Sequence, residues 1–254
     1  MRKFLAHFIS SLIPNRNMRH TVRKTIRNFR IKHLFIKKTK YDFVFSMGEA
    51  CFVADCLKLR NLRKYSGPFD WMYASDFETR FKIFINEFED YFNKSDLQLI
   101  DKNETVAVYK NIRTGLIYNH DFRANQPFDT EYQLVYDKYA RRIKRLIDCA
   151  KSGGRILICY CEMRTASYVD TASLFQLLDY ANMHFSNNID LAYFRHNPNM
   201  KIGTAKMIKQ TPHLRLFEYY GSNGGNIDAN PKEEIIICHN IADNLAFARV
   251  IKNR

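Results

Sequence analysis

A cysteine and a glycine stand where an apolar stretch gives way to a helical pattern, in Ser46-Met-Gly48-Glu-Ala-Cys51. In open α/β sheets, sites form just beyond the carboxyl ends of strands. At the start of a helix, unpaired backbone N–H groups and the helix dipole stabilise a thiolate, the nucleophilic form of cysteine. Gly48 would allow a sharp turn that brings these amides near a ligand. Cys51 is therefore a candidate nucleophile, and the competing interpretation is a small buried residue after a turn.

A cysteine nucleophile also needs a base, and His120 is the candidate for that role. His120 ends the stretch Leu-Ile-Tyr-Asn-His, which reads as a strand, so its imidazole can lie on the same rim as Cys51. A histidine in a solvated loop is the alternative.

The six cysteines, at positions 51, 56, 149, 159, 161 and 238, have neither the density of a disulfide scaffold nor the spacing of a zinc site. We expect reduced cysteines, no metal and no cofactor. Cys159 and Cys161 are two residues apart, so on a strand both side chains would face the same side.

Strand and helix patterns alternate along residues 41–254. Strands are predicted up to Gly48, on both sides of a turn near Arg113–Gly115, and at residues 155–162, 189–194, 214–220 and 233–239. Helices are predicted at residues 51–62, 75–92 (with Ser75 or Asp76 as N-cap), 130–152, 170–185 and 240–253. Continuously apolar strands alternating with helices favour a mostly parallel sheet covered on both faces. The predicted fold is one three-layer α/β/α domain preceded by a basic helical arm.

Residues 1–40 form that arm, because they hold 12 of the 40 Lys and Arg and none of the 26 Asp and Glu. Residues 41–254, with 28 basic and 26 acidic residues, are nearly neutral, which argues against a nucleic-acid-binding domain. No apolar run approaches the length of a membrane-spanning helix.

The arm carries apolar residues at helical spacing, at positions 4, 5, 8, 9, 12 and 13, and Pro14 ends this pattern. A basic amphipathic helix of this kind fits the surface of an anionic membrane. Two alternatives are a secretory signal, for which no small-residue cleavage site is present, and an apolar face packed on the protein's own core. The stretch Leu-Ile-Pro-Asn-Arg-Asn-Met-Arg resembles N-terminal segments of Gram-negative enzymes of lipopolysaccharide and capsule synthesis. That resemblance implies a cytoplasmic protein, peripheral on the inner membrane.

Residues 42–72 resemble the opening motif of a bacterial family of unknown function described as papain-like cysteine peptidases. The pattern is Ser-x-Gly-x-x-Cys, a helix ending in Leu-Arg, and Ser-x-Pro-Phe-Asp-Trp, ending here at Asp70 and Trp71. Weaker family features follow as His120-Asp-Phe and as a helix with Tyr139, Arg141, Arg142 and Arg145. The resemblance implies Cys51 as nucleophile and His120 as base.

The third catalytic member is open. Asp70 is the preferred orienter of the histidine, with a turn-capping role as its alternative. Asp121 is adjacent to His120 and would point away from it, and Glu162 follows a buried strand.

Ser46, Gly48 and Trp71 are expected to contact substrate. Arg141 and Arg142 are candidates for binding a phosphate or a sugar nucleotide, or they belong to a solvated basic helix face.

Three classes of function remain from the sequence. The preferred one is acyl chemistry by Cys51 and His120 on an acyl, peptide or lipid-linked glycan substrate, by hydrolysis or by transfer to a sugar hydroxyl. The others are a glycosyl- or phospho-transferase and a non-catalytic accessory protein, in both of which Cys51 is structural.

Overall fold

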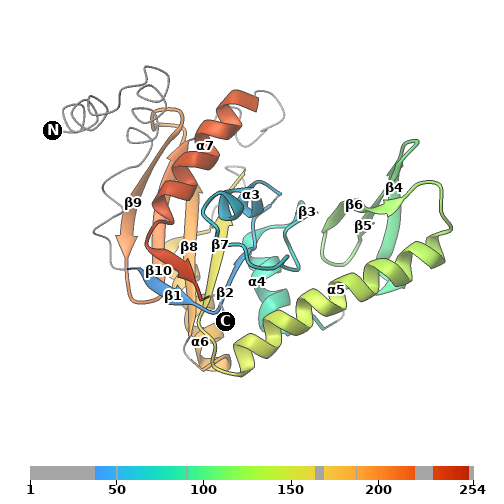
Figure 1. The fold of residues 1–254 in the computed structure, drawn as a ribbon, viewed down its shortest axis with the longest axis horizontal. Coiled ribbons are helices and arrows are strands. Elements are labelled where there is room, and N and C mark those ends of the chain that lie inside the picture. The colour runs from blue at the N-terminus through green and yellow to red at the C-terminus, as the bar shows by residue number, and fades with distance from the viewer. Residues whose placement is uncertain are drawn as a thin grey trace, which may run out of the picture. The chain divides into compact units, whose positions relative to one another are not determined.

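The computed structural model describes residues 38–49, 51–89, 91–163, 169–186, 188–220 and 231–251 (Figure 1). The chain divides into two units, Met1–Lys38 and Thr39–Arg254. All described helices and strands lie in the second unit, and nearly all of the predicted arm lies outside the described residues.

The described part of the chain contains both helices and strands. The helices are α3 (Phe52–Leu59), α4 (Phe77–Ile85), α5 (Phe128–Lys151), α6 (Thr171–His184), α7 (Pro231–Asn244) and a short 3-10 helix (Lys94–Asp96). The strands are β1 (Thr39–Tyr41), β2 (Phe43–Ser46), β3 (Met72–Tyr73), β4 (Leu97–Lys102), β5 (Val106–Asn111), β6 (Ile117–Arg123), β7 (Ile156–Cys161), β8 (Ile189–His196), β9 (Thr204–Gln210), β10 (Leu214–Tyr220) and β11 (Ala248–Val250).

The central sheet has the strand order β2-β7-β8-β10-β9. Neighbours from β2 to β10 are parallel, and β9 pairs antiparallel with β10 at the edge. Every residue of β7 and β8 is buried. Continuously apolar strands are the pattern of a sheet covered on both sides, because neither row of side chains reaches water.

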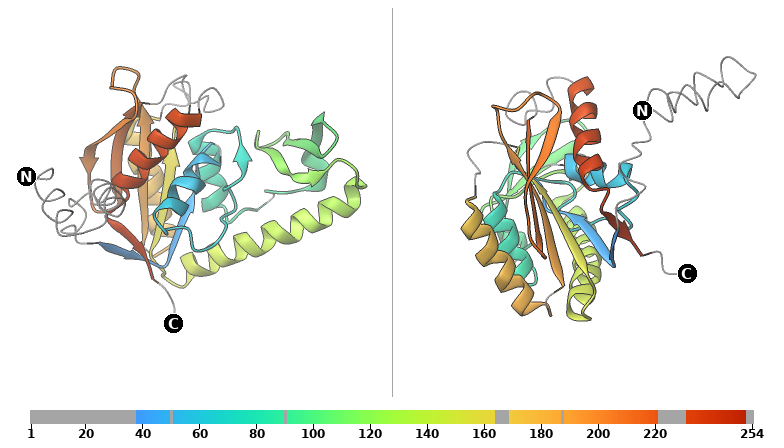
Figure 2. Two further views of the ribbon diagram at one scale, coloured as in Figure 1. Left: turned by 45° about the horizontal axis from the view of Figure 1, so that its top comes forward. Right: turned by 90° about the vertical axis from the view of Figure 1, so that its left-hand side faces the viewer.

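Helices cover both faces of this sheet (Figure 2). Phe43 and Ile158 point into a core shared with α4, α5 and α6, whereas Val44 and Leu157 point into a core shared with α3 and α7. Cys159 and Cys161 lie together on the α3–α7 side, as predicted.

A second sheet of order β3-β6-β5-β4 is antiparallel throughout. The sequence predicts its central hairpin, whose turn contains Gly115 at φ +73°, a value that favours glycine. β3 and β4 are not predicted. The fold is therefore mixed α/β, and among the described strands parallel pairing occurs in the central sheet and in the pair formed by β1 and β11.

The predicted helix at residues 75–92 is too long. Asp76 is the N-cap and accepts from the Thr79 backbone N–H at 2.7 Å, but the helix ends at Ile85. Glu87 and Phe88 take positive φ values of 55° and 65°. Phe88 still packs against Phe84, with ring centroids 6.5 Å apart, so aromatic burial continues after the helix has ended.

The predicted C-terminal elements are wrong over most of their length. Residues 233–239, predicted as a strand, belong to α7. Pro231 at the first helical position and acidic residues in the first turn favour a helix there, and a short apolar run alone does not decide between the two. The predicted terminal helix at residues 240–253 is right only for residues 240–244, the end of α7, and Ala248–Val250 instead forms β11, which pairs parallel with β1.

Candidate active site

Cys51 lies at the N-cap of α3, directly after the turn that leaves β2. The Met47 N–H donates to the Cys159 carbonyl at 2.9 Å and extends the pairing of β2 with β7 to the edge of the sheet. The Asp55 N–H donates to the Cys51 carbonyl at 3.2 Å, which continues the helical pattern back to Cys51. Cys51 is partly exposed. The predicted setting of strand end, turn and helix start is present.

Gly48 has a packing role in this turn. A Cβ built at Gly48 would lie 2.6 Å from Cγ2 of Val53, whose side chain is buried in α3. Ser46 is buried beside it and accepts from the Gly48 N–H at 3.3 Å. The close approach of α3 to β2 therefore requires glycine at position 48.

Asp70 is buried and ion-paired with Arg63. The Nε of Arg63 donates to Oδ2 of Asp70 at 2.6 Å, and the same oxygen accepts from the Gly67 N–H at 2.9 Å. The Nη2 of Arg63 also donates to Oγ of Ser66 at 2.9 Å. Burial raises the pKa of Asp70, and Arg63 opposes that shift. These contacts tie Asp70 to the turn at residues 66–70.

Trp71 and His120 are in contact. Their ring centroids are 6.2 Å apart with an interplanar angle of 82°. β3 and β6 pair antiparallel with Met72 opposite Tyr118, which brings the two segments together. Trp71 precedes Met72 and His120 follows Tyr118 by two residues, so the two rings meet just beyond the paired residues of β3. His120 is exposed.

Asp121 is held by α5. Its Oδ2 accepts from the Tyr139 hydroxyl at 2.7 Å, and its carboxylate pairs with Lys138 of α5. Tyr118 and Phe122, on either side of His120, are buried as well, and the pairing of β6 with β5 is irregular between them, so β6 does not alternate regularly here.

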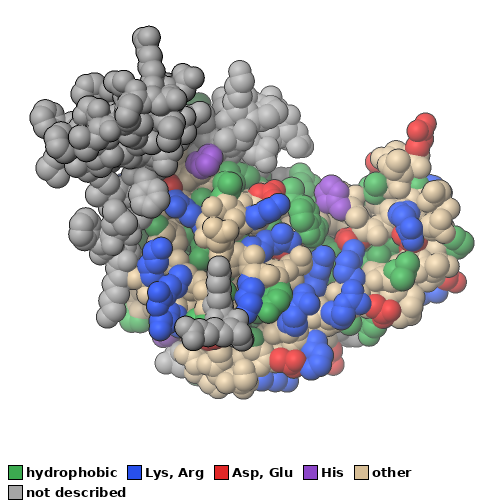
Figure 3. All heavy atoms as spheres, in the orientation of Figure 1, with side chains coloured by type: hydrophobic (Ala, Val, Ile, Leu, Met, Phe, Trp, Pro, Cys, Tyr) green, Lys and Arg blue, Asp and Glu red, His purple; other side chains and the backbone are tan. Residues whose placement is uncertain are grey.

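Lys and Arg gather over the middle of α5 on the face shown in Figure 3. Arg141 is exposed, and the guanidinium carbon of Arg142 lies 5.2 Å from the centroid of the Tyr139 ring. Nη1 of Arg142 is buried and has no hydrogen-bond partner in the described part of the chain. Arg145 donates to the Ser66 carbonyl at 3.3 Å, which joins this helix to the turn that carries Asp70.

Two buried glutamates at the carboxyl edge of the central sheet extend the sequence prediction. Glu49, which the sequence pattern did not indicate, accepts from the Tyr160 hydroxyl at 2.6 Å, and Glu162 accepts from the Tyr193 hydroxyl at 2.6 Å. The two tyrosine rings are 5.1 Å apart on neighbouring strands.

Glu162 is held by a second bond and lies beside a histidine that the sequence did not indicate. Its Oε2 accepts from the backbone N–H of His196 at 3.0 Å, and burial raises the pKa of Glu162. The sequence offered one signal for these residues, which is their place at the carboxyl end of a parallel strand, where sites form in open α/β sheets. This place is shared by Glu49, Glu162 and His196.

The other five cysteines are in settings that disfavour the thiolate or access to it. Cys56, Cys159, Cys161 and Cys238 are buried. Cys149 is partly exposed, but burial together with Asp42 raises its pKa to about 11.

Within the described ranges, no group of three or more His, Cys, Asp and Glu side chains is arranged to hold a metal ion. Across the same residues, no helix has the length and apolar character needed to span a bilayer.

Comparison with known proteins identifies the family. Residues 42–190 match the model of the family described as "Putative papain-like cysteine peptidase (DUF1796)", and the chain belongs to that family. The chain is also similar to the uncharacterised protein R408 of Acanthamoeba polyphaga mimivirus. The two are 28% identical over 178 residues, which cover 61% of this chain and 78% of the viral protein. No solved structure matches the chain.

Proposed function

We propose that this protein is a cysteine hydrolase in which Cys51 is the nucleophile and His120 the general base. The observation that carries the proposal is the position of Cys51 at the start of α3, just beyond the end of β2. The family description, which names a papain-like cysteine peptidase, supports the same chemistry.

The reaction begins when His120 takes the thiol proton of Cys51 and the thiolate attacks a substrate carbonyl carbon. A carbon–sulfur bond forms, and the carbonyl electron pair moves to oxygen. N–H groups of the first turn of α3 have no intrahelical acceptors, and they stabilise the oxyanion. The oxyanion then collapses and expels an amine or alcohol, which receives the proton from His120. A thioester on Cys51 is left.

The fate of the thioester sets the reaction type. Attack by water gives amide or ester hydrolysis. Attack by a sugar hydroxyl gives acyl transfer, and the basic segment at residues 1–40 favours this second candidate. We propose that this segment binds an anionic membrane surface, which would bring the enzyme close to lipid-linked glycans at the inner membrane. Transfer in lipopolysaccharide or capsule synthesis would then be its role.

Thioester trapping tests the proposal. The protein is mixed with a panel of activated esters and peptide amides, quenched with acid, and its intact and peptide masses are measured. We expect one acyl adduct, on Cys51, that is absent from Cys51→Ala and accumulates more slowly in His120→Ala. Cys149→Ala serves as the matched control and should form the adduct normally. Adduct formation that is unchanged in Cys51→Ala would refute the proposal.

The same reaction separates hydrolysis from transfer. If a sugar acceptor increases the rate at which the Cys51 adduct disappears and becomes acylated itself, the enzyme is a transferase. If the rate depends only on water, it is a hydrolase.

A further inference from the structure

The turn at residues 66–71 connects Arg63 to His120 through Trp71. We infer that Arg63 is a positioning residue: held by Asp70 and Ser66, it fixes the Trp71 ring on which His120 rests. The inference depends on the proposed function for the role of His120 as the base. It assigns Asp70 a function different from direct contact with the histidine.

The first step is the anchoring of Arg63. The side chain of Asp70 is 1% exposed and that of Arg63 is 16% exposed, so their ion pair is shielded from solvent. Two donors of the guanidinium are used, Nε on Asp70 at 2.6 Å and Nη2 on Ser66 at 2.9 Å. A planar fork with two fixed bonds has one orientation, which a lysine ammonium cannot reproduce.

The turn at residues 66–70 is shaped so that Asp70 and Ser66 can bind the Arg63 guanidinium. The Gly67 N–H donates to the Asp70 carboxylate at 2.9 Å, and a Cβ at Gly67 would lie 3.2 Å from Oδ1 of Asp70. Phe69 is fully buried and packs on Tyr91 with ring centroids 5.8 Å apart. Within this short segment, Ser66 supplies a hydroxyl for Arg63 and Asp70 supplies the carboxylate. Gly67 leaves space for that carboxylate, and Phe69 anchors the turn in the core.

The second step runs from Arg63 to the histidine. The guanidinium carbon of Arg63 lies 5.5 Å from the centroid of the Trp71 ring, within the range of a cation–π contact. Trp71 meets His120 edge to face at 6.2 Å. Asp121 is engaged with Lys138 and Tyr139, so within the described residues the imidazole is in contact with the Trp71 ring and not with its neighbouring carboxylate.

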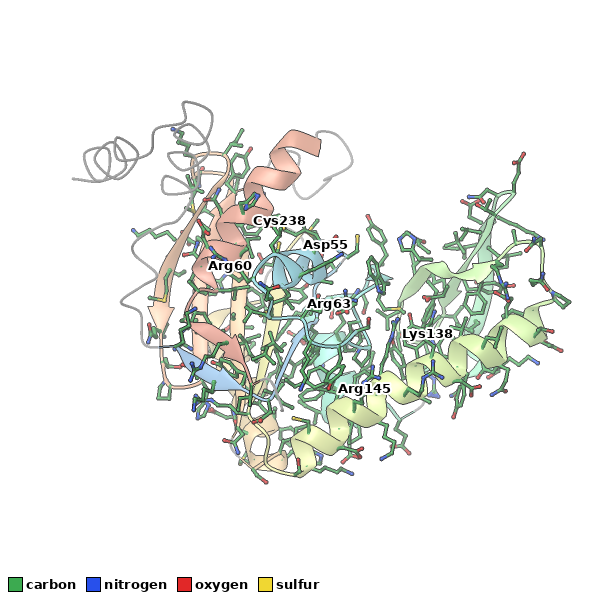
Figure 4. The ribbon with its side chains drawn as sticks, in the orientation of Figure 1. Asp55, Arg60, Arg63, Lys138, Arg145 and Cys238 are labelled. Atoms are coloured by element: carbon green, nitrogen blue, oxygen red, sulfur yellow. The ribbon has the colours of Figure 1, made fainter. Side chains whose placement is uncertain are left out.

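A neighbouring arginine provides a matched control. Arg60 also follows α3, but it ion-pairs with Asp243 and donates to the Ala242 carbonyl of α7. Figure 4 shows Arg60 on the side of α7 and Arg63 on the side of α5. Each arginine is held by an ion pair and by a second hydrogen bond, but Arg63 is the one that lies over Trp71. Arg60→Lys is therefore the matched control for Arg63→Lys.

The experiment uses the fluorescence of Trp71, the single tryptophan of the chain. A protonated imidazole quenches an indole ring that it contacts, so emission should fall as the pH drops through the range in which histidines protonate. In His120→Gln this pH-dependent component should vanish. In Arg63→Lys and in Asp70→Asn its amplitude should fall at least twofold, whereas Arg60→Lys should keep the wild-type amplitude.

Cys51 alkylation gives the second readout. We expect Arg63→Lys to slow alkylation at neutral pH by about fivefold, with little change at high pH, where no base is needed. Trp71→Phe should retain most of the wild-type alkylation rate, because phenylalanine keeps an aromatic ring for Arg63 and His120 to contact. Trp71→Ala should react more slowly, because it has no ring. This comparison decides the matter if Arg63→Lys fails to fold.

The outcomes separate the two proposals. Wild-type fluorescence amplitude in folded Arg63→Lys, or equal alkylation by Trp71→Phe and Trp71→Ala, would overturn the positioning role. A Cys51 thiol that is inert in the wild type, with fluorescence that still responds to Arg63→Lys, would overturn the proposed reaction and leave the Arg63–Trp71–His120 connection standing.

Discussion

At the scale of single residues, Gly48 shows how tightly the turn before Cys51 is packed. A methyl group at this position would approach Cγ2 of Val53 to 2.6 Å and its Cβ to 3.2 Å. Valine is stiff about χ1, so the clash cannot be relieved by a rotation of one end of a flexible chain. Either α3 or the turn must move.

We therefore predict that Gly48→Ala lowers the free energy of unfolding by about 1–3 kcal/mol, the usual effect of overpacking. In the double variant with Val53→Ala, the loss should be smaller than the sum of the two single losses, because the same space is vacated and filled. Urea unfolding of the four proteins measures this. If the losses in free energy of unfolding are strictly additive, the absence of a side chain at Gly48 does not serve to avoid a clash with Val53.

The candidate site was predictable where the chemistry is local. The setting of Cys51, between the end of β2 and the start of α3, was predicted from the order of strand, turn and helix. The partner of Asp70 could not be predicted from the sequence. Whether Asp70 pairs with Arg63 or with His120 depends on how the turn at residues 66–70 folds back on α3. Glu49 was missed for a similar reason, since its partner Tyr160 is 111 residues away.

At the scale of elements, the capping of α4 is the prediction with the clearest test. The sequence left Ser75 and Asp76 as alternatives, and the structure assigns the cap to Asp76, whose carboxylate accepts from the Thr79 N–H. Asp76→Ala should lower the free energy of unfolding by about 1 kcal/mol, whereas Asp76→Ser should cost less because serine also caps. Thermal unfolding compares the variants. An unchanged midpoint in Asp76→Ala would show that the cap contributes nothing.

The elements that sequence patterns predicted correctly are those with a strong period or a buried run. α5 and β7 are examples, because one has an apolar face over 24 residues and the other is apolar throughout. The failures came where tertiary contacts decide. The sequence pattern of Ala248–Val250 does not by itself predict a strand. The segment forms β11 because its backbone pairs with the backbone of β1.

At the scale of the whole molecule, the charge is distributed unevenly along the chain. The chain carries a formal charge of +14, and residues 1–40 supply most of it. The proposal of membrane binding predicts that the full-length protein sediments with phosphatidylcholine vesicles that contain phosphatidylglycerol, and not with phosphatidylcholine alone. Added salt should weaken the binding.

A charge-reversal variant of the arm makes the prediction quantitative. Arg23→Glu, Lys24→Glu and Arg27→Glu together should weaken binding by roughly a hundredfold or more, since each basic residue near an anionic surface contributes about 1 kcal/mol. The same number of reversals at the exposed Lys102, Lys201 and Lys206 is the matched control. Equal losses in both variants would show that the arm has no special role.

The central claim is that Cys51 is activated by His120, and the pH dependence of cysteine alkylation tests it most directly. Each cysteine is followed separately by mass spectrometry in the wild type and in His120→Ala. Cys149 is an internal reference: because its pKa is raised to about 11, its thiol stays protonated and slow at neutral pH.

The account predicts that Cys51 is alkylated rapidly well below pH 8.5, near which an ordinary thiol titrates, and that His120→Ala slows this reaction about tenfold at neutral pH. If Cys51 in the wild type is instead inert, or reacts with the same pH profile in both proteins, the cysteine-enzyme account is wrong.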